Sequence, residues 1–199
     1  MLTIKEIIGK GFGYIATEDI QEDTILFEEK PMILANERFG KYAYDEILYV
    51  ICKVLEDENI LMKFNILAPQ KLNDLHIDIH VEQFIKELKK YNTNLKKNIL
   101  TKINFNQFML LCYKYKRNVF AYKNKISAIL EKGSLFNHSC KPNCIFYYEN
   151  DKMIFKTDTL IKKGDELCIS YINVDQNKDK RQEELYIGYG FKCNCQLCI

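Results

Sequence analysis

Three cysteines near the C-terminal end of the sequence are spaced to bind one metal ion. Cys193-Asn194-Cys195-Gln196-Leu197-Cys198 places three thiols within six residues. A tetrahedral structural zinc needs four protein ligands, so this cluster supplies all but one of them. A disulfide between Cys193 and Cys195 would be strained, because neighbouring side chains of a nearly extended segment point apart. The spacing therefore predicts a zinc site that includes Cys193, Cys195 and Cys198.

The fourth zinc ligand must come from another part of the chain. Cys140, Cys144 and Cys168 are all available by chain count. A zinc ion that joins the tail to one of them would clamp the tail onto the middle of the fold, and metal binding would then supply folding energy for the tail. The alternative is that the tail cysteines are free thiols near a frayed chain end.

Short apolar runs separated by turn residues indicate antiparallel strands in the first and last parts of the chain. The expected strands are 12–16, 24–27, 32–34, 145–148, 153–155 and 167–170. Between these two parts the apolar residues change to helical spacing. Helices are expected from about residue 43 to 55, over 81–91 and over 105–112, and a further short helix over 179–186. The pattern predicts a mainly β protein with a helical insert, of the α+β class.

The composition excludes some kinds of partner. Twenty-nine Lys and Arg residues against 27 Asp and Glu residues give a net charge of +2, so direct nucleic-acid binding through phosphate charge is not expected. Residues 1–10 lack the apolar run of a signal peptide, and no window approaches the roughly 18 to 20 apolar residues of a membrane span. We therefore expect an intracellular protein without a membrane partner, in which the eight cysteines are thiols or metal ligands rather than disulfides.

One segment carries a family resemblance. Gly133-Ser134-Leu135-Phe136-Asn137-His138-Ser139-Cys140, followed by Pro142-Asn143-Cys144, resembles the signature of SET-domain methyltransferases, particularly the branch that includes the SET- and MYND-domain proteins. Four further stretches resemble family segments in the same order: Gly11-Phe12-Gly13-Tyr14, Arg117-Asn118-Val119-Phe120, Gly164 to Tyr171, and Tyr189-Gly190-Phe191 with the cysteine tail. The resemblance covers roughly residues 9–35 and 105–199.

The resemblance implies a SET-domain fold of several small sheets, with a threaded C-terminal segment and a zinc-binding post-SET tail. It divides the single domain 1–199 into N-terminal strands (1–35), a helical insert (36–117), a C-terminal core (118–190) and the post-SET tail (191–199). Residues 36–104 contain a single cysteine, Cys52, so the cysteine-rich MYND module of the relatives is expected to be absent. Either the protein is minimal or the sequence is a truncated form.

The resemblance also assigns a cofactor, S-adenosylmethionine, and the residues around it. Missing side chains would let the backbone at Gly11 and Gly13 approach the cofactor. The residues that match cofactor contacts of the family are Gly11, Gly13, Tyr14, Asn118, Asn137, His138 and Phe191, the last by stacking on the adenine ring. Cys140 matches the cysteine that completes the zinc site, so the implied ligand set is Cys140, Cys193, Cys195 and Cys198.

Tyr171 matches the catalytic tyrosine of the family, and Tyr189 matches a wall of the substrate channel. Methyl transfer requires a neutral lysine amine in line with the sulfonium methyl, which is largely a problem of orientation and needs no Asp or Glu base. The resemblance thus implies a protein-lysine N-methyltransferase of the nucleus or cytoplasm that acts on a histone tail or another protein.

Two other functions compete with this one. A zinc-stabilised SET-fold scaffold without activity would have no chemical use for Asn137, His138 and Tyr171 together. A zinc hydrolase would need an open coordination position, whereas four thiolates close the shell.

Overall fold

The computed structural model describes residues 1–35, 45–71, 99, 101–123 and 126–199. They form two compact units, Met1–Pro31 with Leu130–Ile199, and Met32–Ile129. We call them the first and the second unit and describe each by itself.

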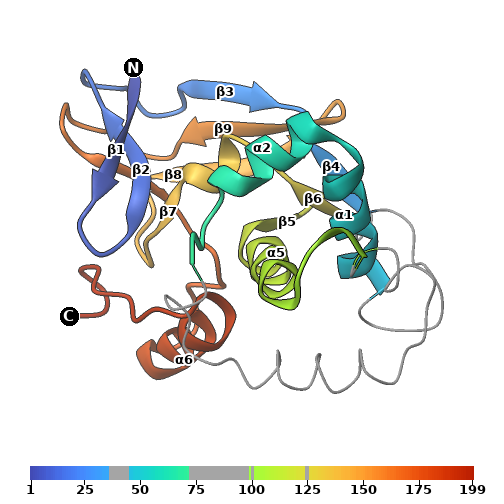
Figure 1. Ribbon diagram of the computed structural model, residues 1–199. Coiled ribbons are helices and arrows are strands. Elements are labelled where there is room, and N and C mark those ends of the chain that lie inside the picture. Colours follow the sequence, from blue (N-terminus) through green and yellow to red (C-terminus); the bar gives the residue numbers. More distant parts are fainter. Residues whose placement is uncertain (36–44, 72–98, 100, 124–125) are drawn as a thin grey trace. The chain divides into compact units, whose positions relative to one another are not determined.

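In the first sheet of the first unit, a strand from late in the sequence lies between two strands that come earlier in the sequence. Its strands are β1 (Leu2–Ile7), β2 (Gly11–Ala16), β10 (Glu166–Ile169) and β7 (Asn137–His138), in this spatial order. β10 pairs antiparallel with β2 and parallel with β7, with Ile169 opposite His138. Figure 1 shows β1 and β2 of this sheet side by side, in blue. The residues that follow β10 and β7 therefore lie close together although 27 residues, 139–165, separate the two strands in the sequence.

The second sheet of the first unit supports the segment that leads into β7. Its strands, in spatial order, are β3 (Ile25–Glu29), β9 (Lys152–Thr157) and β8 (Cys144–Glu149). Asn150 and Asp151 form the tight turn between β8 and β9 with positive φ angles of 47° and 60°, which suit this type of hairpin. The buried ring of Phe155 stacks on Phe136 with centroids 5.2 Å apart, and Tyr14 packs 4.8 Å from Phe136. This aromatic core fixes the residue before Asn137.

Helix α6 (Lys178–Tyr189) and the cysteine tail complete the first unit. The side chain of Asn177 accepts a hydrogen bond from the Lys180 N–H and caps the start of the helix. Gly190 ends the helix in the left-handed conformation, with φ at 78°, and its N–H donates to the carbonyls of Leu185 and Tyr186. The chain then turns directly into the tail.

The second unit combines helices with a small sheet. The sheet contains β4 (Ile33–Ala35), β6 (Ser127–Ile129) and β5 (Val119–Ala121), in this spatial order. The helices are α1 (Asp45–Glu56), α2 (Glu58–Ile66) and α5 (Phe105–Asn118). Asp57 caps α2, and Asn104 with Gln107 forms a capping box on α5. Fully buried apolar residues of α1 and α2 build the core, among them Val50, Ile51 and Phe64.

Most expected elements are confirmed. Each predicted strand overlaps an observed one, and the predicted helices at 43–55, 105–112 and 179–186 correspond to α1, α5 and α6. The helix expected over 81–91 lies outside the described residues. The sequence did not indicate β1, β5, β6 or β7; the last three are only two or three residues long, too short to show a period.

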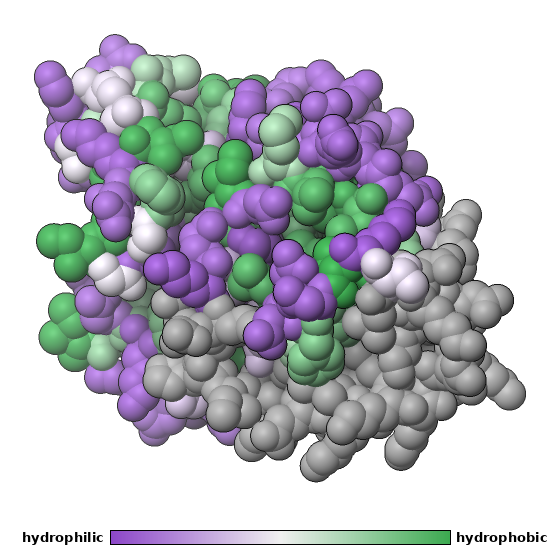
Figure 2. Space-filling view, in the orientation of Figure 1, coloured by the Kyte–Doolittle hydropathy of each residue, from purple (hydrophilic) through white to green (hydrophobic). Residues whose placement is uncertain are grey.

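On the surface, hydrophilic and hydrophobic side chains of the described residues are interspersed over the face that Figure 2 shows. Among the described helices, none has the length and apolar character that a membrane span requires.

Candidate active site and metal centre

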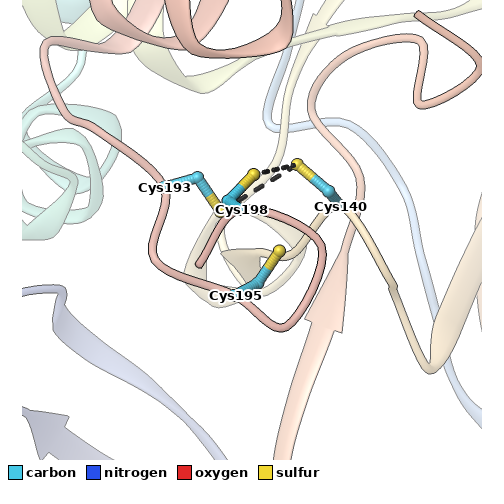
Figure 3. Close-up of side chains that lie close together, drawn as sticks. All are labelled: Cys140, Cys193, Cys195 and Cys198. Carbon is cyan, nitrogen blue, oxygen red and sulfur yellow. Dashed lines mark hydrogen bonds between the residues drawn. The ribbon is translucent and has the colours of Figure 1, made fainter. Parts of the chain in front are cut away.

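Four cysteines of the first unit converge on one point. The sulfur atoms of Cys140, Cys193, Cys195 and Cys198 all lie within 4.8 Å of one another (Figure 3). The Cys140 sulfur is 3.5 Å from that of Cys198 and 3.9 Å from that of Cys193. A tetrahedral zinc with Zn–S bonds of about 2.3 Å requires sulfur atoms about 3.8 Å apart. The cluster fits a zinc ion, and its fourth member is Cys140, not Cys144 or Cys168.

The fold of the tail explains why three of these thiols share one side. The N–H groups of Cys198 and Ile199 both donate to the carbonyl of Cys195, at 2.8 and 3.1 Å. This turn brings Cys198 back over Cys195. The short Cys-x-Cys-x-x-Cys spacing is therefore a turn around the metal position.

Three thiols of the cluster differ in acidity. Burial raises the pKa of Cys140 and of Cys193. Burial also acts to raise the pKa of Cys195, but backbone N–H groups of Leu197 and Cys140 stabilise its thiolate, and the pKa is lowered to about 7. Cys195 is thus better prepared to bind a cation than Cys140 or Cys193, and a bound divalent metal would favour the thiolate form of those two as well.

His138 connects the cysteine cluster to the end of β10. Its ring is buried; Nδ1 accepts a hydrogen bond from the Tyr171 N–H at 3.1 Å, and Nε2 lies 3.3 Å from the Cys140 sulfur. Since Nδ1 accepts, we assign the ring proton to Nε2. Burial lowers the pKa of His138 to about 4, with contributions from the positive charges of Lys10 and Arg181, so the ring is neutral at pH 7. Both ring nitrogens are occupied within the protein.

Tyr171 lies within a group of aromatic side chains. Its hydroxyl donates to the Phe136 carbonyl at 2.5 Å, and its own carbonyl accepts the hydroxyl of Tyr189 at 3.2 Å. The ring centroids of Tyr189 and Tyr171 lie 4.7 Å apart, and the ring centroid of Phe191 lies 6.5 Å from each of them. We call Tyr171, Tyr189 and Phe191 the aromatic triad. Burial raises the pKa of Tyr171, so its hydroxyl stays protonated and acts as a donor.

The glycine segment of β2 lies against Asn137. The amide nitrogen of Asn137 donates to the Glu166 carboxylate at 3.0 Å and to the Phe12 carbonyl at 3.4 Å. A Cβ atom on Gly13 would lie 2.4 Å from this nitrogen, so the missing side chain of Gly13 leaves room for the Asn137 amide in this position. Gly11, in contrast, has a φ of 80° and open space where a side chain would be.

Two residues predicted to contact the cofactor, Tyr14 and Asn118, form hydrogen bonds with backbone carbonyls of the protein. Tyr14 is buried, and its hydroxyl donates to the Lys132 carbonyl at 3.1 Å. Asn118 belongs to the second unit, where its amide donates to the carbonyls of Ala68 and Lys114 at 2.6 and 2.7 Å. The cofactor roles of Tyr14 and Asn118 stay predictions.

One residue that supports the site was not predicted. The carboxylate of Glu29 accepts three backbone hydrogen bonds, from the N–H groups of Glu131, Lys132 and Gly133 at 2.6, 2.9 and 2.8 Å. It thereby anchors the short 3-10 helix Gly133–Leu135, which leads to Phe136 and Asn137. About a hundred residues separate donor and acceptor, so no local pattern in the sequence signals this contact.

Comparison with known proteins identifies related sequences. Residues 11–172 match the SET domain family. The chain is 34% identical over 194 residues to a SET domain-containing protein of Acanthamoeba polyphaga mimivirus, which covers 96% of this chain and 74% of that protein. It is 48% identical over 71 residues to a SET and MYND domain-containing protein of Dictyostelium discoideum, and 41% identical over 90 residues to a histone-lysine N-methyltransferase of Arabidopsis thaliana. These two matches cover 36% and 42% of this chain and only 18% and 21% of the relatives.

Solved structures share the fold. The SET domain of LSMT, crystallised with lysine and AdoHcy, superposes with a TM-score of 0.69 at 16% identity, over 97% of this chain and 52% of that one. Rubisco LSMT bound to AdoMet gives a TM-score of 0.63 over the same shares of the two chains. The expected SET-domain fold is thus confirmed. With a family match over most of its length and a viral relative aligned over nearly all of it, the chain belongs to the SET domain family.

Proposed function

We propose that this chain is a protein-lysine N-methyltransferase, which transfers a methyl group from S-adenosylmethionine to a lysine side chain of a histone or another protein. The observation that carries the proposal is the position of the Tyr171 hydroxyl, which is fixed 2.5 Å from the Phe136 carbonyl within the aromatic triad. The names of the relatives support it, since several are histone-lysine N-methyltransferases.

Orientation and desolvation are the tasks of the protein in this reaction. When bound, S-adenosylmethionine supplies an electrophilic methyl group. A free lysine has a pKa of about 10.4, so an apolar channel must disfavour its charged form before the amine can attack. The rings of Tyr171 and Tyr189 suit such a channel, and their hydroxyls are both fixed by backbone carbonyls. A neutral Tyr171 hydroxyl and the nearby Phe136 carbonyl would orient the amine and the methyl group.

The other predicted residues have roles consistent with this proposal. The backbone of Asn137 and His138 would contact the cofactor, because their side chains already bind within the protein. Gly11 would let the cofactor approach β2, and Phe191 would stack on the adenine. Cys140 and the three tail cysteines would hold zinc as a structural ion, which keeps Tyr189 and Phe191 beside Tyr171.

A labelled-methyl transfer assay on core histones and on a cell lysate tests the proposal. Tyr171→Phe should lower turnover by roughly 100-fold or more, as expected for loss of a positioned polar group in catalysis. Its affinity for S-adenosylmethionine should stay within a few-fold of the original. Tyr147→Phe, on the exposed side of β8, is the matched control and should leave turnover unchanged. Equal methylation by the Tyr171 variant would remove Tyr171 from the mechanism.

Calorimetric titration with S-adenosylmethionine separates the enzyme from a scaffold. Zinc-loaded, folded protein should bind the cofactor. No binding under these conditions would favour an inactive SET-fold module. In the methyl-transfer assay, label that enters lysate proteins but not core histones would support the enzyme proposal and reject core histones as the substrate.

A further inference from the structure

Arg181 is a buried cation that has no carboxylate partner in the part of the chain that the structure describes. It lies on α6 and is only 7% exposed. Its Nη1 donates to the Gln176 carbonyl at 2.5 Å, and its Nη2 donates to the Leu197 carbonyl at 3.0 Å. Within the described residues, no ion pair joins it and its Nε has no hydrogen-bond partner. A buried charge in such a place is costly unless an anion compensates it.

The cysteine cluster is the source of such an anion. Nη2 of Arg181 lies 3.9 Å from the Cys198 sulfur. Four thiolates around one Zn²⁺ carry a net charge of −2, and the guanidinium would reduce this to −1 in a place that is largely shielded from water.

We propose that Arg181 is the counter-charge of the metal centre, a positioning residue that stabilises the four-thiolate zinc complex and so holds the tail with Phe191 in place. This inference rests on the zinc site of the proposed function, but not on methyl transfer. Residues that contact metal ligands from outside commonly tune metal affinity, and their loss typically costs about 10- to 100-fold.

The neighbouring residue allows charge to be separated from tail geometry. The Gln182 side chain donates to the Cys193 carbonyl at 2.6 Å and accepts from the Cys193 N–H at 2.9 Å. Gln182 thus binds the start of the tail with a neutral amide, while Arg181 binds its end at Leu197 and Cys198 with a charged group. Consecutive residues of α6 hold the tail at both ends, and one of them carries charge.

Zinc affinity, measured by competition with a chromophoric chelator, is the test. Arg181→Gln removes the charge and should weaken zinc binding by about 10- to 100-fold. Arg181→Lys keeps the charge but loses the planar fork, and should recover most of this loss. Lys178→Gln removes an exposed cation from the same helix and should leave the affinity within about 3-fold, as expected for a screened surface charge. Gln182→Ala should weaken binding less than Arg181→Gln.

Cobalt(II) substitution shows whether the variants still form the site. The thiolate-to-cobalt absorption of Arg181→Lys should match that of the original protein, which indicates four intact thiolate ligands. Zinc binding by Arg181→Gln at the original affinity would overturn the inference, and so would an Arg181→Lys variant as weak as Arg181→Gln. If the Arg181 variants change zinc affinity as expected but the unchanged protein transfers no methyl group, the counter-charge stands and the enzyme proposal fails.

Discussion

Nδ1 of His138 accepts the backbone N–H of Tyr171 at 3.1 Å, while the other nitrogen of the same ring lies 3.3 Å from the Cys140 sulfur. One neutral imidazole therefore joins the backbone at the candidate catalytic tyrosine to a candidate zinc ligand. The two ends of the ring cannot both keep their contacts if the metal centre moves away from β10. We expect the metal centre and the position of Tyr171 to be coupled through this ring.

His138→Leu tests this coupling, because it keeps an apolar side chain and removes both polar contacts. The Tyr171 N–H would lose its acceptor in a partly buried place, which should lower the free energy of unfolding by about 1–3 kcal/mol. Urea denaturation of the zinc-loaded protein measures the change. Ser139→Ala is the control, since the Ser139 hydroxyl bonds only locally with Lys141. Equal stability of the two variants would show that the His138 contacts are not needed.

Loss of a zinc ligand should disturb the aromatic triad, although the substitution itself changes no predicted cofactor-binding residue. Cys140→Ser replaces a thiolate ligand with a weaker one, and loss of a structural zinc removes the folding energy of the tail. We expect a lower zinc content. The affinity for S-adenosylmethionine should fall by about 10-fold or more, in line with loss of support around a metal site. Calorimetry and metal analysis measure the two quantities.

Cys52→Ser on α1 is the matched control for Cys140→Ser, because Cys52 lies outside the cysteine cluster. It should keep both zinc and cofactor binding. A zinc-free Cys140→Ser protein that binds the cofactor as tightly as the original would show that metal and cofactor sites are independent.

The Glu29 carboxylate gives a prediction about the segment before β7. Glu29→Ala removes the acceptor of three backbone N–H groups and should destabilise the protein by about 2 kcal/mol, the loss typical of hydrogen bonds to a charged group. Glu29→Gln keeps one oxygen and should cost less. Glu28→Gln, which breaks only the exposed ion pair with Lys152, should cost about 0–1 kcal/mol. Thermal unfolding that ranks the three differently would exclude Glu29 as the anchor.

The sequence identified the metal cluster because its spacing is local. Cys193, Cys195 and Cys198 follow one another in a single turn, and the choice of Cys140 as fourth ligand came from the family signature. Every strand of four or more residues except β1 was also predictable, since alternation and turn residues are short-range signals. The order of the strands was not, because β10 enters the sheet between β2 and β7 through contacts far apart in sequence.

Side-chain contacts between distant residues escaped prediction for the same reason. Gly13 was expected to leave room for a cofactor, and the structure shows in addition that its missing Cβ leaves room for the Asn137 amide. His138 was expected to contact the cofactor, and the structure shows in addition that its two ring nitrogens lie against the Tyr171 N–H and the Cys140 sulfur. A motif gives the residue type at a position; which partner the side chain chooses depends on the packed fold.

Lys114 of α5 makes stability in the second unit depend on pH. It is 1% exposed, and its ammonium donates to the carbonyls of Asn65, at 3.0 Å, and Leu67. Desolvation lowers its pKa from 10.5 to about 8. Below pH 8 the folded and unfolded chains both hold the proton. Between pH 8 and 10.5 the unfolded chain binds more protons than the folded one, so this group makes the free energy of unfolding rise with pH.

Comparison with Lys114→Met isolates this contribution, because ionisation of cysteines and tyrosines is common to both proteins. The free energy of unfolding of the original protein minus that of the variant should be constant below pH 8. It should rise by up to about 3 kcal/mol toward pH 10.5, since each unit of pKa difference corresponds to about 1.4 kcal/mol. Urea denaturation at several pH values from 7 to 10 measures it. A difference that stays flat over this range would mean that Lys114 keeps an ordinary pKa in the folded protein, held by its two carbonyl acceptors.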